Sequence, residues 1–483
     1  MQLLLYILLF VCSIAVAFEV LKNPRKVTIA VSKTEAVVMG FFGAALAAMG
    51  FSALTSWSPV TSLLGVNGQD FVSFTFLLGL FVYMVAGLLF IEKEERRFMV
   101  RATAGALGLA MIIDLIAYAY SGSLLLSDGA VELGLLGALS APLVYWLVKR
   151  ETIGDRVMGA LVGLAALSSL VTVDLTIIWI IVLVISIGLM LGYFVEDRSH
   201  KLLAGIPALF AAFAVILLLF DSSVGAGLGA EVAPSIGLTW DITKESLAST
   251  RVFLGYGPGT FSMVYDEFRP DSVAASSFWS IRFAGSESFF LTSLMTFGVL
   301  PLIAVLVALI VALGGGWIRL KNRITGKSGK GSIEAEVLLV GIVLALVLTP
   351  AAPSLMVLGL VAILWIFIEQ RVQTEVRLSR SWLSPKVTSI LVVMLLSIGL
   401  MIHGLRFLSE QAFSSAIKSQ NTQSIQETRS SIDAAASLMP INDAMYRNLA
   451  YGLLLSGVDE LTRETPDDQL VARYFALSID AAQ

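Results

Sequence analysis

Charged side chains are scarce in this sequence of 483 residues: only 14% are Asp, Glu, Lys or Arg, whereas 57% are hydrophobic. The mean hydropathy is +0.86. A chain this apolar cannot enclose its hydrophobic residues in one water-excluding core, so lipid has to act as the solvent for much of its surface. The composition therefore predicts an all-α, polytopic membrane protein and excludes a water-soluble globular enzyme.

Cysteine and histidine are nearly absent. The single cysteine, Cys12, lies in an apolar run and has no partner for an intrachain disulfide. The two histidines, His200 and His403, are expected in a cytoplasmic loop and at the external end of the last span. Neither is placed as the partner of a serine nucleophile, which argues against a serine hydrolase. The sequence also lacks a basic arm, so we expect no nucleic-acid partner.

Long apolar runs, in contrast, recur along the whole chain, and we expect each to be a membrane segment. The sixth and seventh runs, and the tenth and eleventh, are separated by so few residues that each pair forms a tight hairpin or partly re-entrant segments. The run at the N-terminus contains Ala15-Val16-Ala17, which has the form of a signal cleavage site, but basic residues follow it rather than precede it. We therefore expect it to be retained as the first of twelve spans. The spans are predicted at about 2–20, 36–56, 71–91, 103–120, 131–148, 157–173, 175–194, 203–220, 288–313, 335–348, 355–368 and 387–405.

Lysine and arginine occur in the odd-numbered loops of this arrangement and are missing from the short even-numbered loops. The positive-inside rule then places the odd loops in the cytoplasm and the even loops outside. The chain accordingly divides into spans one to eight at 1–220, an external loop with short helices at 221–287, spans nine to twelve at 288–405 and an external tail at 406–483. This topology places the large loop and the tail on the external face of the membrane.

The tail is polar and has helical spacing, with a Pro-Ile-Asn-Asp break between two helical stretches. It is similar to a tetratricopeptide-type helix pair, and one such pair needs neighbours for stability. We expect a longer natural protein, or a partner, to continue the array. A helical array of this kind indicates a protein partner or a protein acceptor.

The external loop contains the sequence GYGPGTF, in which Gly255, Gly257 and Gly259 surround a proline. Such a segment forms a rigid turn whose backbone can approach either a ligand or another helix closely. It lacks the Gly-Lys-Ser/Thr of a phosphate-binding P-loop. The three glycines are therefore candidates for substrate contact, with a purely structural turn as the alternative.

Three arginines of the same loop, Arg251, Arg269 and Arg282, are candidates for an anion site. The planar guanidinium group matches phosphate geometry, and a cation at the outer face of a membrane would meet lipid phosphate or pyrophosphate. The alternative for each arginine is an ordinary ion pair with an acidic residue of the loop. Tyr265 and Trp279 are candidates for sugar or lipid contact.

Glu287 stands where the loop enters the ninth predicted span. A carboxylate there can act as a general base near the bilayer surface, or it can simply interact favourably with a helix N-terminus. The neighbouring Ser286 and Ser288 are candidate capping residues. Asp114 and Asp174 lie at or near membrane depth and are functional candidates for that reason.

The order LGYGPGTF, RF and FGVLP along the loop and ninth span, together with the topology and the helical tail, resembles the family of O-antigen ligases and O-antigen polymerase-like membrane glycosyltransferases. The resemblance implies a metal-independent enzyme without a cofactor that transfers a glycan from undecaprenyl pyrophosphate to an acceptor hydroxyl of a lipid, glycan or protein. Arg251, Arg269 and Arg282 would hold the pyrophosphate. Glu287 occupies the position of the family's catalytic histidine, and no match to the family's serine–arginine pair is found near 172–174.

Two other functions remain open. The chain could be a transporter or flippase of the same lipid-linked glycan, which predicts an internal inverted repeat and a deep polar cavity. It could also be a non-catalytic membrane anchor whose tail binds external partners, which predicts paired or solvent-facing arginines and no groove beside Glu287.

Overall fold

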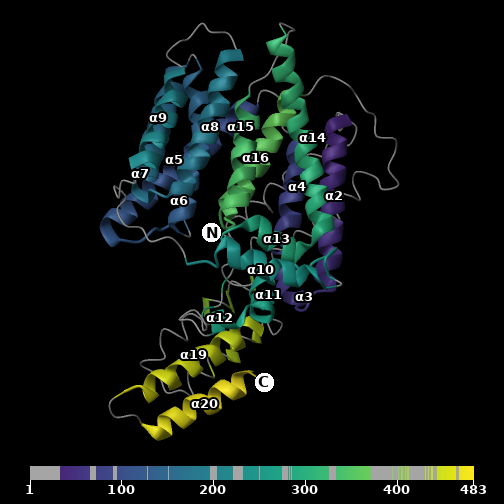
Figure 1. Ribbon diagram of the computed structural model, residues 1–483, viewed down its shortest axis with the longest axis vertical. Coiled ribbons are helices and arrows are strands. Elements are labelled where there is room, and N and C mark those ends of the chain that lie inside the picture. The colour runs from purple at the N-terminus through teal and green to yellow at the C-terminus, as the bar shows by residue number, and fades with distance from the viewer. Residues whose placement is uncertain are drawn as a thin grey trace. The chain divides into compact units, whose positions relative to one another are not determined.

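The computed structural model describes residues 33–65, 72–90, 95–127, 129–150, 152–195, 204–220, 232–249, 251–274, 281, 283, 285–325, 333–370, 443–463 and 467–482, with single positions between 394 and 438. The described residues form helices and turns and contain no strand (Figure 1). The chain separates into two units. The bundle unit comprises Arg25–Leu63 and Phe71–Trp382, and the tail unit comprises Met1–Pro24, Leu64–Asp70 and Leu383–Gln483.

The bundle unit is built from long apolar helices linked by short helices and turns. Its helices are α2 (Lys33–Leu54), α3 (Pro59–Leu64), α4 (Phe74–Phe90), α5 (Glu95–Ser121), α6 (Ala130–Val148), α7 (Ile153–Val173), α8 (Thr176–Val195), α9 (Gly205–Phe220), α10 (Ile236–Leu247), α11 (Phe261–Phe268), α12 (Asp271–Ala274), α13 (Phe289–Phe297), α14 (Val299–Ile324), α15 (Glu334–Leu348) and α16 (Pro353–Gln370).

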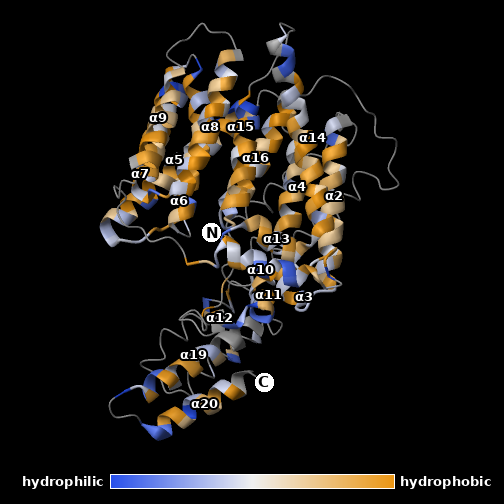
Figure 2. Ribbon diagram, viewed as in Figure 1, coloured by the Kyte–Doolittle hydropathy of each residue, from blue (hydrophilic) through white to orange (hydrophobic). Residues whose placement is uncertain are grey.

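Six of these helices, α2, α5, α6, α7, α8 and α14, are long and apolar enough to cross a membrane, and α4, α9 and α16 are shorter apolar helices. Figure 2 shows apolar residues along nearly their full length. Large side chains such as Leu109, Leu161 and Ile310 are exposed on their surfaces, which is the arrangement expected where the solvent is hydrocarbon rather than water. The protein is therefore a membrane protein.

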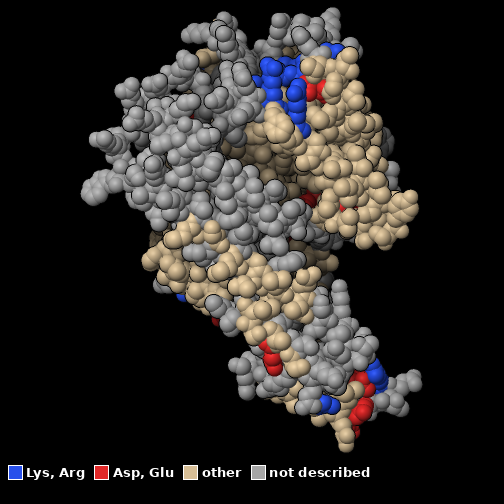
Figure 3. Space-filling view, turned by 180° about the vertical axis from the view of Figure 1, so that it is seen from behind, with Lys and Arg blue, Asp and Glu red and all other residues tan. Residues whose placement is uncertain are grey.

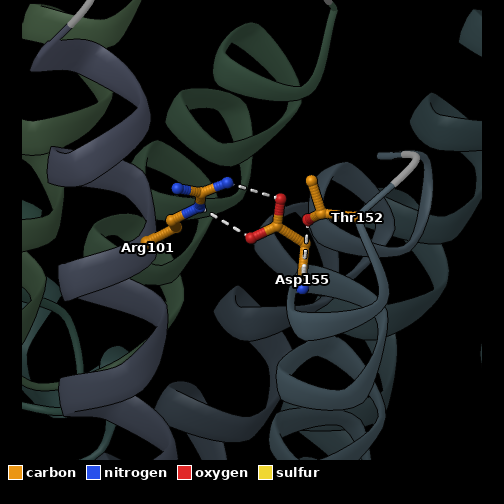
Figure 4. A network of polar contacts seen from close by, with 3 residues as sticks. All are labelled: Arg101, Thr152 and Asp155. Atoms are coloured by element: carbon orange, nitrogen blue, oxygen red, sulfur yellow. Dashed lines mark hydrogen bonds and ion pairs between the residues drawn. The ribbon is translucent and has the colours of Figure 1, made fainter.

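The two ends of the bundle differ in charge. At one end, Arg101 of α5 forms two parallel hydrogen bonds of 2.6 and 2.7 Å with Asp155 near the start of α7 (Figure 4). Lys149, just after α6, pairs with Glu334 of α15 at 3.4 Å. Most Lys and Arg side chains of the bundle that are visible in Figure 3 gather at this end, where α14 terminates. We call it the basic end.

The opposite end carries α10 to α13, and we call it the loop end. There Ser354, at the start of α16, donates a hydrogen bond of 2.5 Å to Glu132 in the first turn of α6. The backbone N–H of Phe289 donates to the carbonyl of Thr349, just after α15, at 2.9 Å. Successive long helices therefore run in alternating directions, as the charge pattern of the loops predicts.

Ten of the twelve predicted spans fall on described helices, whereas the run at 2–20 and most of the run at 387–405 lie outside the described residues. The predicted ninth span, 288–313, is wrong as a single helix. It is divided into α13 and α14 at Gly298, whose φ of 83° lies in the left-handed region that a helix cannot contain. The membrane-crossing part is α14 alone.

A break inside an apolar region leaves helix-end N–H and C=O groups that lipid cannot satisfy. Residues 252–257, which we call the clamp, supply the missing partners. The N–H groups of Tyr256 and Gly257 donate to the carbonyls of Met295 and Thr296 at 3.1 and 2.8 Å. In return, the N–H groups of Val299 and Leu300 donate to clamp carbonyls at 3.0 and 3.1 Å. The break is therefore closed by backbone hydrogen bonds on both sides.

The tail unit contains a helix pair, α19 (Asp443–Leu461) and α20 (Asp468–Ala482). The hydroxyl of Ser478 donates to the carbonyl of Ala450 at 2.7 Å, and Gly457 lies against Tyr474 and Phe475, so the helices run antiparallel. The predicted pair flanks the break at 440–443, so α19 corresponds to its second helix and most of its first helix lies outside the described residues. The observed pair is one helix further along the chain. Its membership of a tetratricopeptide array stays a prediction, and residues 413–429 lie outside the described residues.

Replacing Gly298 by Ala should destabilise the protein by at least about 1–3 kcal/mol, because the residue keeps a strained positive φ. Its new Cβ would also lie 2.6 Å from the carbonyl oxygen of Phe253. A lower midpoint of thermal unfolding in detergent is the expected result. Gly314→Ala, also in α14, is the matched control, because no atom lies within 4 Å of its added Cβ. Equal midpoints for the two variants would contradict the structural role of the break.

Candidate functional site

The site is built on two short helices, α10 and α13, which lie side by side at the loop end. Glu287 connects their starts: its Oε2 accepts a hydrogen bond of 3.2 Å from the N–H of Ile236, and its own N–H donates to the carbonyl of Pro234 at 3.3 Å. At their other ends, Tyr256 donates from its hydroxyl to the carbonyl of Ser246 in α10 and from its N–H to Met295 in α13. The two helices therefore run parallel.

Glu287 is partly buried, and its Oε1 has no hydrogen-bond partner among the described residues. The position of Oε2 at the first N–H of α10 is a favourable location for a carboxylate. The helix whose N-terminus it meets is α10, and not the helix that follows it in sequence. One carboxylate oxygen thus holds the loop in place while the other is left for chemistry.

Hydroxyl groups beside Glu287 attach α13 to the end of α15. Ser288 is the N-cap of α13, accepting from the N–H of Leu291 at 3.4 Å, as its sequence position indicates, and it donates to the carbonyl of Val347 at 2.7 Å. Ser286 donates to the carbonyl of Ser288 at 2.7 Å and lies 3.0 Å from the hydroxyl of Thr292. This buried network fixes the direction in which Glu287 leaves the backbone.

Arg251 lies at the opposite end of α10 and α13 from Glu287. Its guanidinium group donates to the carbonyl of Thr55 at 3.1 Å and lies 5.8 Å from the ring of Trp57 and 5.6 Å from the ring of Tyr256. It makes no ion pair with any described carboxylate. With nine residues in α13 and twelve in α10, about 13–18 Å of helix separates Arg251 from Glu287. The structure does not bring these two predicted site residues together.

The other predicted binding residues are placed differently. Arg269 follows α11 and lies 3.8 Å from Asp266, a long ion pair between partly exposed groups. Its neighbour Phe268 packs against Trp57 and Tyr256, so Arg269 belongs to the Arg251 side of the site. Arg282 and Trp279 lie outside the described residues.

The three glycines of GYGPGTF all have positive φ, of 69°, 116° and 71° in chain order. A Cβ on Gly255 would lie 2.6 Å from the N of Gly298, and one on Gly257 would collide with Ser56 and Ser62. The backbone comes close to α13, α14 and α3, which accounts for the glycines by packing. Their contact with a substrate stays a prediction.

Tyr265 is fully buried in a second small core with Phe261 and Phe283, where its ring meets that of Phe283 edge-on at 5.2 Å. Its hydroxyl has no hydrogen-bond partner among the described residues. Burial raises the pKa of the Tyr265 phenol above its ordinary value, and the nearby charge of Arg269 opposes this shift only in part. The residue supports the loop from inside, and contact with a substrate stays a prediction.

An apolar cavity of about 210 Å³ lies beneath α13, in the interior of the bundle. It is lined by α2, α4, α14, α15 and α16 as well as α13, which contributes Phe289, Ser293 and Phe297 from a single face, and it is partly open to the surroundings. On α2 it extends from Phe42 to Met49, a length of about 10 Å along the helix. Its walls suit a hydrocarbon chain and offer no site for a charged group.

Acidic residues within the long helices have structural partners. Asp114 accepts hydrogen bonds from the N–H groups of Leu125, Leu126 and Ser127 at 2.6–3.0 Å, and so fixes the turn after α5. Asp174 ends α7 in the left-handed conformation and accepts from the indole of Trp179 at 2.9 Å. These structural roles account for both carboxylates at membrane depth, and a functional role for either one stays a prediction. Glu132, a buried acid that sequence reasoning did not single out, lies at the loop end.

The chain matches no protein-family model and no curated protein sequence. Its resemblance to the O-antigen ligases therefore stays a prediction from the motif and topology. Among the described residues, no group of three or more His, Cys, Asp and Glu side chains is arranged to hold a metal ion. What the described site offers chemically is one carboxylate with a free oxygen, arginines and an apolar cavity.

Replacing Tyr265 by Phe should protect the protein against alkaline unfolding. A raised folded-state pKa means that the unfolded chain loses this proton first, so the wild type loses stability as the pH rises past the ordinary tyrosine value of 10.0. Between pH 8 and about pH 11, the difference in unfolding midpoint between variant and wild type should be constant below pH 9 and should grow in favour of the variant above pH 10. Tyr120→Phe, at an exposed tyrosine, is the control and should follow the wild-type curve.

Proposed function

We propose that this protein is a membrane glycosyltransferase of the O-antigen ligase or polymerase type. It would transfer a glycan from an undecaprenyl-pyrophosphate donor to an acceptor hydroxyl at the external face of the membrane. The observation that carries the proposal is that α13 joins two chemically opposite environments, one acidic and polar and the other apolar. Glu287 and its hydroxyl network stand at the start of this helix, and Phe289, two residues further on, lines the apolar cavity. A lipid-linked substrate has the same two parts.

We base the proposed sidedness on the charges at the basic end. Lys149, Arg101 and their neighbours would face the cytoplasm, because positively charged residues are retained on that side. The loop end would then face outward, in a bacterial inner membrane, where lipid-linked glycans are presented. Part of the polyprenyl chain would occupy the cavity beneath α13, and the pyrophosphate would lie near Glu287.

In the proposed reaction the acceptor oxygen attacks the anomeric carbon of the donor sugar. The bond from that carbon to the pyrophosphate oxygen breaks, and the electron pair leaves with the pyrophosphate. Glu287 takes the acceptor proton on Oε1, since Oε2 is occupied by the N–H of Ile236. Arg282 is the loop arginine closest to Glu287 in sequence and would stabilise the departing charge. Arg251 is too distant from Glu287 for that role.

Two features weigh against the alternative functions. A transporter needs a polar pathway, whereas the cavity within the bundle is lined by apolar residues apart from Ser293. A passive anchor predicts loop arginines that are paired or solvent-facing and no groove beside Glu287, whereas Arg251 is held by the carbonyl of Thr55 beside two aromatic rings, and α13, which begins next to Glu287, lines a cavity. The predicted protein partner of the tail rests on α19 and α20 and is independent of the catalytic proposal.

Glu287→Gln should reduce glycan transfer by about 10²–10⁴-fold, because the amide cannot take the acceptor proton. The amide oxygen can still accept from Ile236, so the fold should be kept. Release of undecaprenyl pyrophosphate from a lipid-linked oligosaccharide in proteoliposomes is the measurement. Glu267→Gln, an exposed carboxylate on α11, is the matched control and should retain wild-type transfer. Transfer at the wild-type rate by Glu287→Gln would exclude this residue as the base.

Ala45→Phe, which places a ring in the cavity, should raise the KM for the lipid-linked donor several-fold and change kcat little. Gly359→Leu is a second filling variant, since a Cβ there meets only Ile342, at 3.6 Å. Leu164→Phe, on an exposed face of α7, is the control. An unchanged KM in both folded filling variants would show that the lipid chain binds elsewhere.

A further inference from the structure

An exposed tryptophan stands beside the unpaired arginine at the loop end. Trp57 lies in the turn between α2 and α3 and is 44% exposed. Tyr256 meets it edge-on at 4.5 Å and Phe268 stacks with it at 6.5 Å, with ring planes 14° apart. Two rings from a distant part of the chain thus hold the indole in one orientation while much of its surface stays open.

Arg251 adds a positive charge to this cluster of aromatic side chains. Its guanidinium group lies within 6 Å of two of the rings, and the carbonyl of Thr55 takes one of its five N–H donors. The remaining donors have no described partner. The indole N–H of Trp57 likewise has no described partner. Arg269, directly after Phe268, is paired with Asp266 and contributes positive charge to the same side of the site.

We propose that Trp57 and Arg251 form a binding subsite for an anionic sugar unit of a glycan. The C–H face of a pyranose ring can pack against the exposed part of the Trp57 indole, and the indole N–H can donate to a ring hydroxyl. A carboxylate or phosphate on the sugar matches the free donors of Arg251. A flat apolar surface and a pre-oriented cation in contact are what such a ligand requires.

This subsite rests on the proposed function and extends it. It lies at the far end of α10 and α13 from Glu287, so it would hold a sugar more than one ring away from the bond being made. Trp57 is therefore a positioning residue and not a catalytic one. A subsite at this distance from Glu287 would make the protein prefer long, negatively charged glycans over short or neutral ones.

Binding of free saccharides tests the subsite without requiring transfer. The full chain in nanodiscs would be titrated with a hyaluronan tetrasaccharide, with neutral chitotetraose and with inorganic phosphate. Trp57→Ala should weaken both saccharides about fivefold or more and leave phosphate unchanged. Arg251→Gln should weaken the hyaluronan fragment and phosphate about tenfold and leave chitotetraose unchanged. Trp57→Phe, which keeps the packing but loses the N–H, should give an intermediate loss.

Controls come from the same end of the bundle. Trp240→Ala removes an indole of similar exposure, and Lys244→Gln removes a cation paired with Asp241; neither should change binding. If Trp57→Ala binds all three probes like the wild type, Trp57 is a membrane-interface anchor and the subsite is refuted. The same holds if the wild type binds no saccharide.

Failure of this inference and failure of the proposed function are distinguishable. Glu287→Gln should bind the tetrasaccharide like the wild type while losing transfer. Saccharide binding without transfer in the wild type would preserve the subsite and overturn the enzyme. Glycan transfer by a wild type that binds no saccharide at Trp57 would support the enzyme and refute the subsite.

Discussion

A break between two helices leaves backbone N–H and C=O groups without partners in either helix, and the break at Gly298 shows how this protein supplies those partners. The clamp at 252–257 satisfies the ends of α13 and α14 together. It can do so only because Gly255 and Gly298 let two backbones meet without side chains between them. One consequence is that α13 becomes a separate element, free to lie over the cavity instead of continuing α14.

The chemistry of the loop end depends on that separation. Because α13 runs parallel to α10, its start carries Glu287 and its end meets the clamp, from which Tyr256 reaches toward Trp57 and Arg251. A charged carboxylate environment and an aromatic, cationic environment are thus held at two ends of one rigid pair of helices. A linear substrate that touches both must be long, which agrees with a glycan better than with a small metabolite.

The apolar helices of the bundle could be predicted from sequence, because hydropathy reports directly on contact with lipid, and the sidedness that the Lys and Arg pattern indicates stays a prediction. The break was missed because apolar residues continue through Phe297-Gly298-Val299. The available signal was Gly298 followed by Pro301 in the first turn of α14, a helix end next to a helix start. The distance between Arg251 and Glu287 could not be predicted, since two residues of one loop can lie at either end of the helices that the loop contains. Trp57 was missed because it lies some 200 residues earlier in a short turn.

The burial of α6 also has a consequence for how the helices assemble during synthesis. This helix is covered on nearly every side, and its neighbour Lys149 meets Glu334 across a sequence separation of 185 residues. At the usual pace of translation, α15 emerges on the order of 10–40 s after α6. For that interval the side of α6 that α15 will cover faces lipid or the insertion machinery, and Lys149 cannot yet form its ion pair with Glu334. The central helix, which follows α2, α4 and α5 in the chain, is thus made well before α15, the helix that completes its surroundings.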